Sequence, residues 1–167
     1  VLDPKREDCS YPYKELSGCG VGFKLLQAFC QQNEINSLAL FEYLDLLAVS
    51  IASDIVPLTG ENRILAYFGL KKLNQSPRPG LAALVDLNKN KRHLTISGIV
   101  FGIGPRINAA GRMKHAGAAV DLLLAESFDE AEALANSIDH QNDERRTFDT
   151  HITEEALDMI SKDKDQL

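Results

Sequence analysis

Apolar residues recur every three or four positions along most of the chain, and this spacing predicts a largely helical protein. The polar, proline-containing start at 3–14 predicts an extended loop instead. The segment 37–53 is apolar almost throughout, and its length favours a buried helix over a strand. Together the patterns predict helices over 17–32, 37–53, 60–75, 80–87 and 118–126.

Two segments between these helices are less regular. Residues 95–103 fit either a helix opened by Thr95 or a strand, because Gly98 and Gly102 weaken both patterns. A further short strand would fit near Val1. Residues 104–117 are rich in glycine and arginine.

The C-terminal part of the chain predicts one long helix from Ser127 to Lys164. Ser127 with Glu130 three positions later is typical of a capping box. Beyond it, apolar residues recur at helical spacing and nothing breaks the pattern. We expect a mostly exposed helix, bent near 138–142, that packs along a body or bridges two domains.

Charge is distributed unevenly along the chain. The net charge is −6, yet residues 1–120 hold 14 Lys and Arg against 10 Asp and Glu, while residues 121–167 hold 4 against 14. The net value alone disfavours a nucleic-acid partner mildly. A basic body followed by an acidic helix nevertheless leaves phosphate binding open for the first 120 residues.

The cysteines and the hydropathy limit the class of protein further. Cys9, Cys19 and Cys30 are odd in number and contain no Cys-x-x-Cys pair, so neither a disulfide framework nor a structural zinc site is expected. A reducing cytoplasm is the expected location. No apolar run reaches the roughly 18 residues of a membrane span, so we expect no membrane partner.

Asp54 is the first candidate for chemistry. It ends a long apolar segment and precedes Ile-Val-Pro-Leu, where a charge must be solvated, paired or bound to a metal. One interpretation is an ordinary aspartate at a helix end. The other is a metal ligand presented at the edge of a core.

The second candidate is the segment 102–112, Gly-Ile-Gly-Pro-Arg-Ile-Asn-Ala-Ala-Gly-Arg. It lacks the third glycine of a dinucleotide fingerprint and the Gly-Lys-Ser/Thr of a P-loop. Its small residues would allow a ligand to approach the backbone, Arg106 and Arg112 could bind phosphate oxygens, and Asn108 adds an amide. A tight turn with solvated arginines fits the same residues.

Several segments together resemble the RecJ exonuclease family of the DHH phosphoesterase superfamily. The resemblance covers residues 1–150 and is most specific in two stretches, Ala-Ser-Asp-Ile-Val-Pro-Leu at 52–58 and Gly-Pro-Arg-Ile-Asn-Ala-Ala-Gly-Arg at 104–112. Further matching pieces lie at 2–6, 11–24 and 142–145.

The resemblance implies a metal-dependent exonuclease of DNA repair and recombination. Such an enzyme degrades single-stranded DNA from 5′ to 3′, using water activated by Mn²⁺ or Mg²⁺. By the match, Asp54 is a catalytic metal ligand, and Arg106, Asn108 and Arg112 line the nucleic-acid path. Residues 1–126 would be the C-terminal part of an α/β DHH phosphoesterase domain, mainly α when isolated. Residues 127–167 would be the helix that leads to a DHHA1 domain.

The sequence also departs from the family pattern. The Asp-x-Asp, Asp-His-His and Gly-Gly-His motifs are absent, and the opening Val1 to Pro4 is typical of a strand end. We therefore expect an internal fragment that alone neither binds catalytic metal tightly nor cleaves DNA, since a two-metal site needs several ligands. Two alternatives stay open: a different DHH phosphoesterase acting on oligonucleotides, cyclic dinucleotides or pyrophosphate, and a non-catalytic helical binding module.

Overall fold

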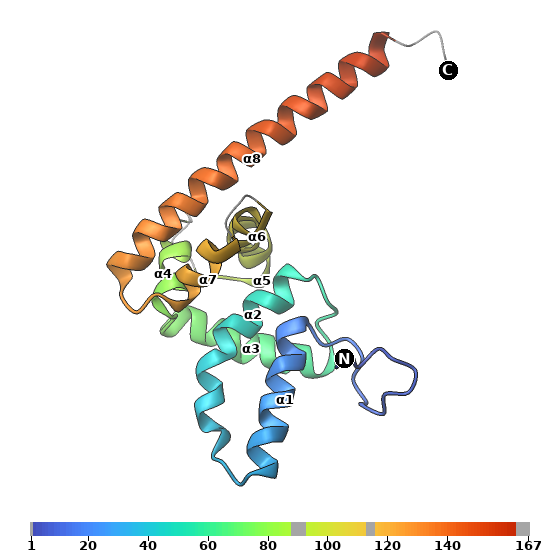
Figure 1. Cartoon of the computed structure of the whole chain (residues 1–167), viewed down its shortest axis with the longest axis vertical. Coiled ribbons are helices and arrows are strands. Elements are labelled where there is room, and N and C mark those ends of the chain that lie inside the picture. Colours follow the sequence, from blue (N-terminus) through green and yellow to red (C-terminus); the bar gives the residue numbers. More distant parts are fainter. Residues whose placement is uncertain (1, 88–92, 113–115, 163–167) are drawn as a thin grey trace.

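A computed structural model describes residues 2–87, 93–112 and 116–162, with the side chains of residues 112 and 116 outside the description. Every regular element in these ranges is a helix, which confirms the mainly α fold class (Figure 1). Val1, near which a short strand would fit, lies outside them. In chain order the elements are α1 (Gly18–Gln32), the 3₁₀-helix η1 (Ser37–Tyr43), α2 (Leu44–Ser53), α3 (Gly60–Gln75), α4 (Pro79–Asp86), α5 (Ile96–Gly98), the π-helix η2 (Ile99–Ile103), α6 (Gly104–Arg112), α7 (Ala116–Leu124) and α8 (Phe128–Lys162).

The helical predictions hold well, and the structure decides two alternatives that the sequence left open. At 95–103 the helix is present and not the strand: the Thr95 hydroxyl accepts a hydrogen bond from the Gly98 N–H at 3.1 Å and opens a helix. That helix continues without interruption through η2 into α6. The tight turn that also fitted 102–112 is therefore wrong, because Gly104 and Pro105 lie inside a continuous helical run.

Two buried clusters share α2 between them. One contains Leu16, Phe23, Leu47, Ile51 and other side chains from α1 to α3. The other gathers aliphatic side chains from α2, from α4 to α7 and from the beginning of α8. Of the predicted buried helix at 37–53, α2 thus lies at the centre of the molecule, whereas residues 37–43 form a 3₁₀-helix on which only Leu40 is buried.

Two glycines allow helices to approach closely. A methyl group added at Gly69 on α3 would lie 2.1 Å from the Leu44 carbonyl oxygen, at the start of α2. A methyl group at Gly80 on α4 would lie 2.0 Å from the Leu122 carbonyl oxygen on α7. Real non-bonded atoms cannot come so near, so these helix contacts depend on the missing Cβ atoms.

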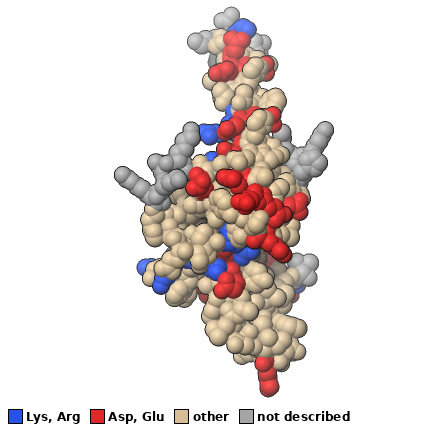
Figure 2. Space-filling model, turned by 90° about the vertical axis from the view of Figure 1, so that its left-hand side faces the viewer, with Lys and Arg blue, Asp and Glu red and all other residues tan. Residues whose placement is uncertain are grey.

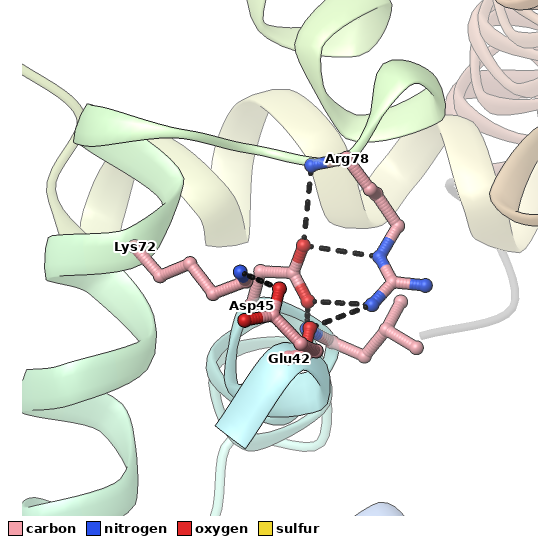
Figure 3. Close-up of polar contacts among 5 residues, drawn as sticks. Glu42, Asp45, Lys72 and Arg78 are labelled. Atoms are coloured by element: carbon pink, nitrogen blue, oxygen red, sulfur yellow. Dashed lines mark hydrogen bonds and ion pairs between the residues drawn. The ribbon is translucent and has the colours of Figure 1, made fainter. Parts of the chain in front are cut away.

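A buried ion pair joins α2 to the start of α4 (Figure 3). Asp45 is fully buried, and Arg78 donates to its two carboxylate oxygens at 3.0 Å from Nε and 2.8 Å from Nη2. The backbone N–H of Arg78 adds a third bond to Asp45 at 3.3 Å. Beside this pair, Lys72 donates to Glu42 at 2.6 Å. The carboxylate in the first turn of α2 is thereby paired and hydrogen-bonded, as a buried charge requires.

Helix α8 begins where the sequence predicted and extends far beyond the body (Figure 1). The Glu130 N–H donates to the Ser127 hydroxyl at 3.3 Å, and the Glu130 carboxylate accepts from the Glu126 N–H at 3.4 Å. Only Ala131, Ala135, Ile138 and Asn142 are buried on this helix, at the spacing of one helical face. From 146 to 162 every residue is exposed, and the helix runs on without the expected bend.

Candidate metal and nucleic-acid site

Asp54 lies exposed at the C-terminal end of α2. It is the C-cap residue, and its N–H donates to the Ser50 carbonyl oxygen at 2.9 Å. The Ser50 hydroxyl donates to the Asp54 Oδ2 atom at 3.1 Å and orients the carboxylate. A cation is favoured at this end of a helix, because the last carbonyl groups carry the negative end of its dipole. Asp54 therefore suits a metal ligand chemically.

The backbone after Asp54 is strained. Ile55 has a φ of 53°, in the left-handed region that a β-branched residue rarely adopts. Its side chain is 79% exposed, so no packing contact offsets this conformation. Strain of this kind costs about 1–3 kcal/mol and concentrates at functional sites. The left-handed residue turns the chain sharply away from α2 and leaves the Asp54 carboxylate at a corner.

The start of α6 lies against the end of α2, so the structure brings the two candidate segments together. A methyl group added at Gly104 would lie 3.0 Å from the Ser53 hydroxyl oxygen. That hydroxyl is buried and has no hydrogen-bond partner within the described atoms. Asp54, the next residue, is therefore close in space to the Gly-Pro-Arg segment, although 50 positions separate the two in the sequence.

The three polar residues predicted on this segment differ in their surroundings. The Arg106 side chain is only 15% exposed; Nε donates to Asp139 on α8 at 2.6 Å, and Nη1 donates to the Gly102 carbonyl oxygen at 2.7 Å. Asn108 is exposed on α6. Arg112 ends α6, and its side chain lies outside the described residues. Arg106 thus connects α6 to α8, a contact that the sequence analysis did not predict.

Metal ligation by this chain would rest on Asp54. Within residues 2–87, 93–112 and 116–162, no three His, Cys, Asp or Glu side chains gather into a group that could hold an ion. A carboxylate alone can contribute one or two oxygen ligands to Mg²⁺ or Mn²⁺, which prefer six. The chemistry available here is one exposed carboxylate beside a helix that carries an amide and arginines.

An apolar pocket of about 490 Å³ lies elsewhere, between the N-terminal loop and α1. Tyr11 and Lys24 are among its lining residues, and both contact Glu61 at the start of α3, at 2.7 Å each. Burial and the Glu61 carboxylate raise the pKa of Tyr11 to about 12. Burial acts to raise the pKa of Glu61, but the bonds from Lys24 and Tyr11 outweigh it and hold that pKa below its usual value. None of the predicted site residues lines this pocket.

The sequence analysis did not identify two residues near the candidate site. Asp139, the partner of Arg106, lies 33 positions away within a charged helix, and no local signal distinguishes it from its acidic neighbours. Phe101 is 82% exposed on η2. A helical pattern laid over 95–103 would have found it, because Phe101 falls between the buried positions Ile99 and Ile103.

The surface of α8 is acidic, as the distribution of charge along the sequence predicts. Figure 2 shows acidic side chains gathered along α8, where Asp and Glu exceed Lys and Arg. None of the helices in the described part of the chain combines the length and the apolar character needed to cross a lipid bilayer.

Comparison with known proteins identifies the same fold in a class of metal-binding nucleases. No family model matches the chain. It is 39% identical over 163 residues to the single-stranded-DNA-specific exonuclease RecJ of Bacillus subtilis, covering 97% of this chain and 20% of that protein. It is 35% identical to the Escherichia coli RecJ exonuclease, covering 97% of this chain and 30% of the relative.

The solved structures agree. A Thermus thermophilus RecJ in complex with Mg²⁺ superposes with a TM-score of 0.78 at 33% identity, over 87% of this chain and 23% of that one. A manganese-bound RecJ superposes with a TM-score of 0.79 over 90% of this chain and 38% of that one. The helical body and the long helix are thus those of a segment of these metal-binding proteins. Over 97% of its length the chain thus resembles a segment of the RecJ exonucleases, and it spans about 20–30% of the length of the curated relatives it matches.

Proposed function

We propose that this chain forms part of a metal-dependent exonuclease that degrades single-stranded DNA from 5′ to 3′ in DNA repair and recombination, in the cytoplasm. The observation that carries the proposal is the close approach of Ser53, the residue before Asp54, to Gly104 at the start of α6. Its matched relatives are named single-stranded-DNA-specific exonucleases, and two solved neighbours hold Mg²⁺ or Mn²⁺. Residues 1–126 then belong to the phosphoesterase domain and 127–167 to a connecting helix.

In this proposal Asp54 is a ligand of Mn²⁺ or Mg²⁺, and the remaining ligands come from outside the described residues. The metal supplies an activated water for attack on the phosphodiester. Ser50 fixes the orientation of the Asp54 carboxylate, and the end of α2 favours the cation. Asn108 and Arg112 on α6 would contact the DNA backbone. Arg106 would do so by exchanging Asp139 for a phosphate oxygen, another anionic acceptor for the guanidinium.

Asp54→Asn tests the metal role. The alignment with Bacillus subtilis RecJ over 163 residues allows this chain to replace the matching segment of that protein. We expect the unmodified chimera to release nucleotides from a single-stranded oligonucleotide with Mn²⁺. The D54N chimera should lose at least about 100-fold in kcat/KM, roughly 2.7 kcal/mol of transition-state stabilisation, because an amide binds the metal more weakly than a carboxylate.

The matched control is Asp121→Asn, which removes an exposed carboxylate from α7 and should leave the rate unchanged. A D54N chimera as active as the D121N chimera would contradict the metal role. A folded but inactive unmodified chimera would contradict the nuclease assignment itself. The 167-residue chain alone should neither bind Mn²⁺ tightly nor digest DNA, and digestion by it would contradict the view that the other ligands lie elsewhere.

Asp139→Asn tests whether Arg106 contacts DNA. If phosphate competes with Asp139 for the guanidinium, removing the carboxylate charge should tighten binding of oligo(dT) by roughly 3- to 10-fold at low salt. Fluorescence anisotropy of a labelled oligonucleotide would measure this. Asp149→Asn on the exposed part of α8 removes the same charge far along the helix and serves as the control. Equal affinities of D139N and D149N would assign Arg106 a purely structural role.

A further inference from the structure

Phe101 is the most exposed large apolar side chain in the described part of the chain, at 82%. Its neighbours Ile99 and Ile103 on the same π-helix are fully buried. Ile55 is the second most exposed, at 79%. Both residues are near the contact between Ser53 and Gly104 in the sequence. Ile55 follows Ser53 by two residues, and Phe101 precedes Gly104 by three. The two most exposed apolar groups thus lie within three residues, along the chain, of the contact between Ser53 and Gly104.

The exposed face of the helix continues from Phe101 toward Asn108. Between 97 and 111 the exposed positions are 97, 101, 108 and 111, with Pro105 half-buried between them, while 99, 103, 109 and 110 are buried. This three- to four-residue spacing places the aromatic ring and the Asn108 amide on one side of η2 and α6. A ligand lying along this side would meet the ring first and the amide further along the same face.

The π-helix sets the direction of Phe101. The Gly104 N–H donates to the Ile99 carbonyl oxygen, five residues back, and this widened turn accommodates one more residue than an α-helix would. Single π turns are rare within α-helices and are frequent at functional sites. Here Ile99 and Ile103, four residues apart, lie in the core, while Phe101 between them projects into solvent.

We propose that Phe101 is a platform on which a base of single-stranded DNA stacks, beside the metal and phosphate contacts of the proposed function on which this inference rests. Stacking on an aromatic ring is available for every base, so it suits an enzyme that must not depend on sequence. It is available only for an unpaired base, because a paired base is already stacked on its neighbours. Phe101 would therefore favour single strands over duplexes.

The chain contains no tryptophan, and this makes a direct test possible. Phe101→Trp introduces a single indole at the platform, and Phe148→Trp introduces one at an exposed position of α8 as the control. Titration with oligo(dT) should quench the emission of F101W, because a stacked base quenches indole, and leave F148W unchanged. Phe101→Ala should bind oligo(dT) roughly 5- to 150-fold more weakly than the unmodified chain. Its melting temperature should not change, because the ring packs against little.

The outcomes separate the two proposals. If the chain binds oligo(dT) and F101A binds equally well, the stacking proposal fails and the proposed function stands. If the chain alone does not bind, the same substitutions are made in the Bacillus subtilis chimera, where F101A should raise KM for single strands and reduce the preference over duplex. A chimera whose F101A variant instead melts at a lower temperature with unchanged KM would show that protein covers Phe101. Absence of single-strand cleavage by the folded chimera would overturn both proposals.

Discussion

Gly69→Ala should destabilise the chain by about 3 kcal/mol or more. The added methyl group would lie 2.1 Å from the Leu44 carbonyl oxygen and 2.8 Å from the Ala48 Cβ atom. Neither neighbour can move alone, because Leu44 opens α2 and Ala48 is fully buried at the centre of the molecule. Helices α2 and α3 must separate, and the loss spreads to both buried clusters. Urea denaturation followed by circular dichroism would measure the change in the free energy of unfolding.

Gly22→Ala is the matched control on α1. An added methyl group there meets nothing within 4 Å, so only the helix propensity changes. Alanine is favoured over glycine inside a helix by about 1 kcal/mol, and G22A should therefore be slightly more stable than the unmodified chain. Equal effects of G69A and G22A would show that the close approach of α2 and α3 does not exist in solution.

Asp45→Ala should cost about 3–5 kcal/mol, the second large effect. The substitution leaves the Arg78 guanidinium without its main partner, and the side chain of Arg78 is only 19% exposed. It also removes the acceptor for the Arg78 N–H at the start of α4. Asp158→Ala breaks an ion pair on the exposed part of α8, where the partner Lys162 is 74% exposed, and should cost well under about 1 kcal/mol.

Replacing Asp45 and Arg78 together by leucine separates pairing from burial. Since both charges leave at once, the double variant should be more stable than D45A. If the double variant loses as much unfolding free energy as Asp45→Leu and Arg78→Leu lose in sum, the two residues act independently. The bidentate contact in Figure 3 would then contribute no coupling energy.

Local patterns in the sequence identified the helices because each rests on contacts near in sequence. The range 60–75 was predicted with the bounds that α3 has, and Thr95 and Ser127 cap helices as expected. The segment 102–112 also fitted a tight turn, because glycine and proline break helices in isolation. Tertiary packing overrides this: α6 buries Ala109 and Ala110 in the core and holds Arg106 against α8.

The candidate site was only partly predictable for the same reason. Asp54 and Gly104 could be singled out by residue type. That Ser53, the residue before Asp54, lies against Gly104 could be learned only from the fold. The ion pairs Asp45–Arg78 and Arg106–Asp139 each span 33 positions, a separation at which no periodicity carries information. The exposure of Phe101 could have been predicted, because a helical pattern over 95–103 places it between the buried positions Ile99 and Ile103.

The length of α8 has a mechanical consequence. Its 35 residues extend over about 50 Å, and the part beyond Asn142, held by no buried side chain, covers about 30 Å of this. A tilt of about 5° at the buried end would displace the far end by roughly 2.5 Å at that length. The Arg106–Asp139 pair lies at the last buried turns of α8, so it is close to the point about which the exposed part of the helix would tilt. Exchange of Asp139 for another anion at Arg106 would change the tilt of α8. The resulting displacement would be larger at the distal end of the helix than at the contact with α6.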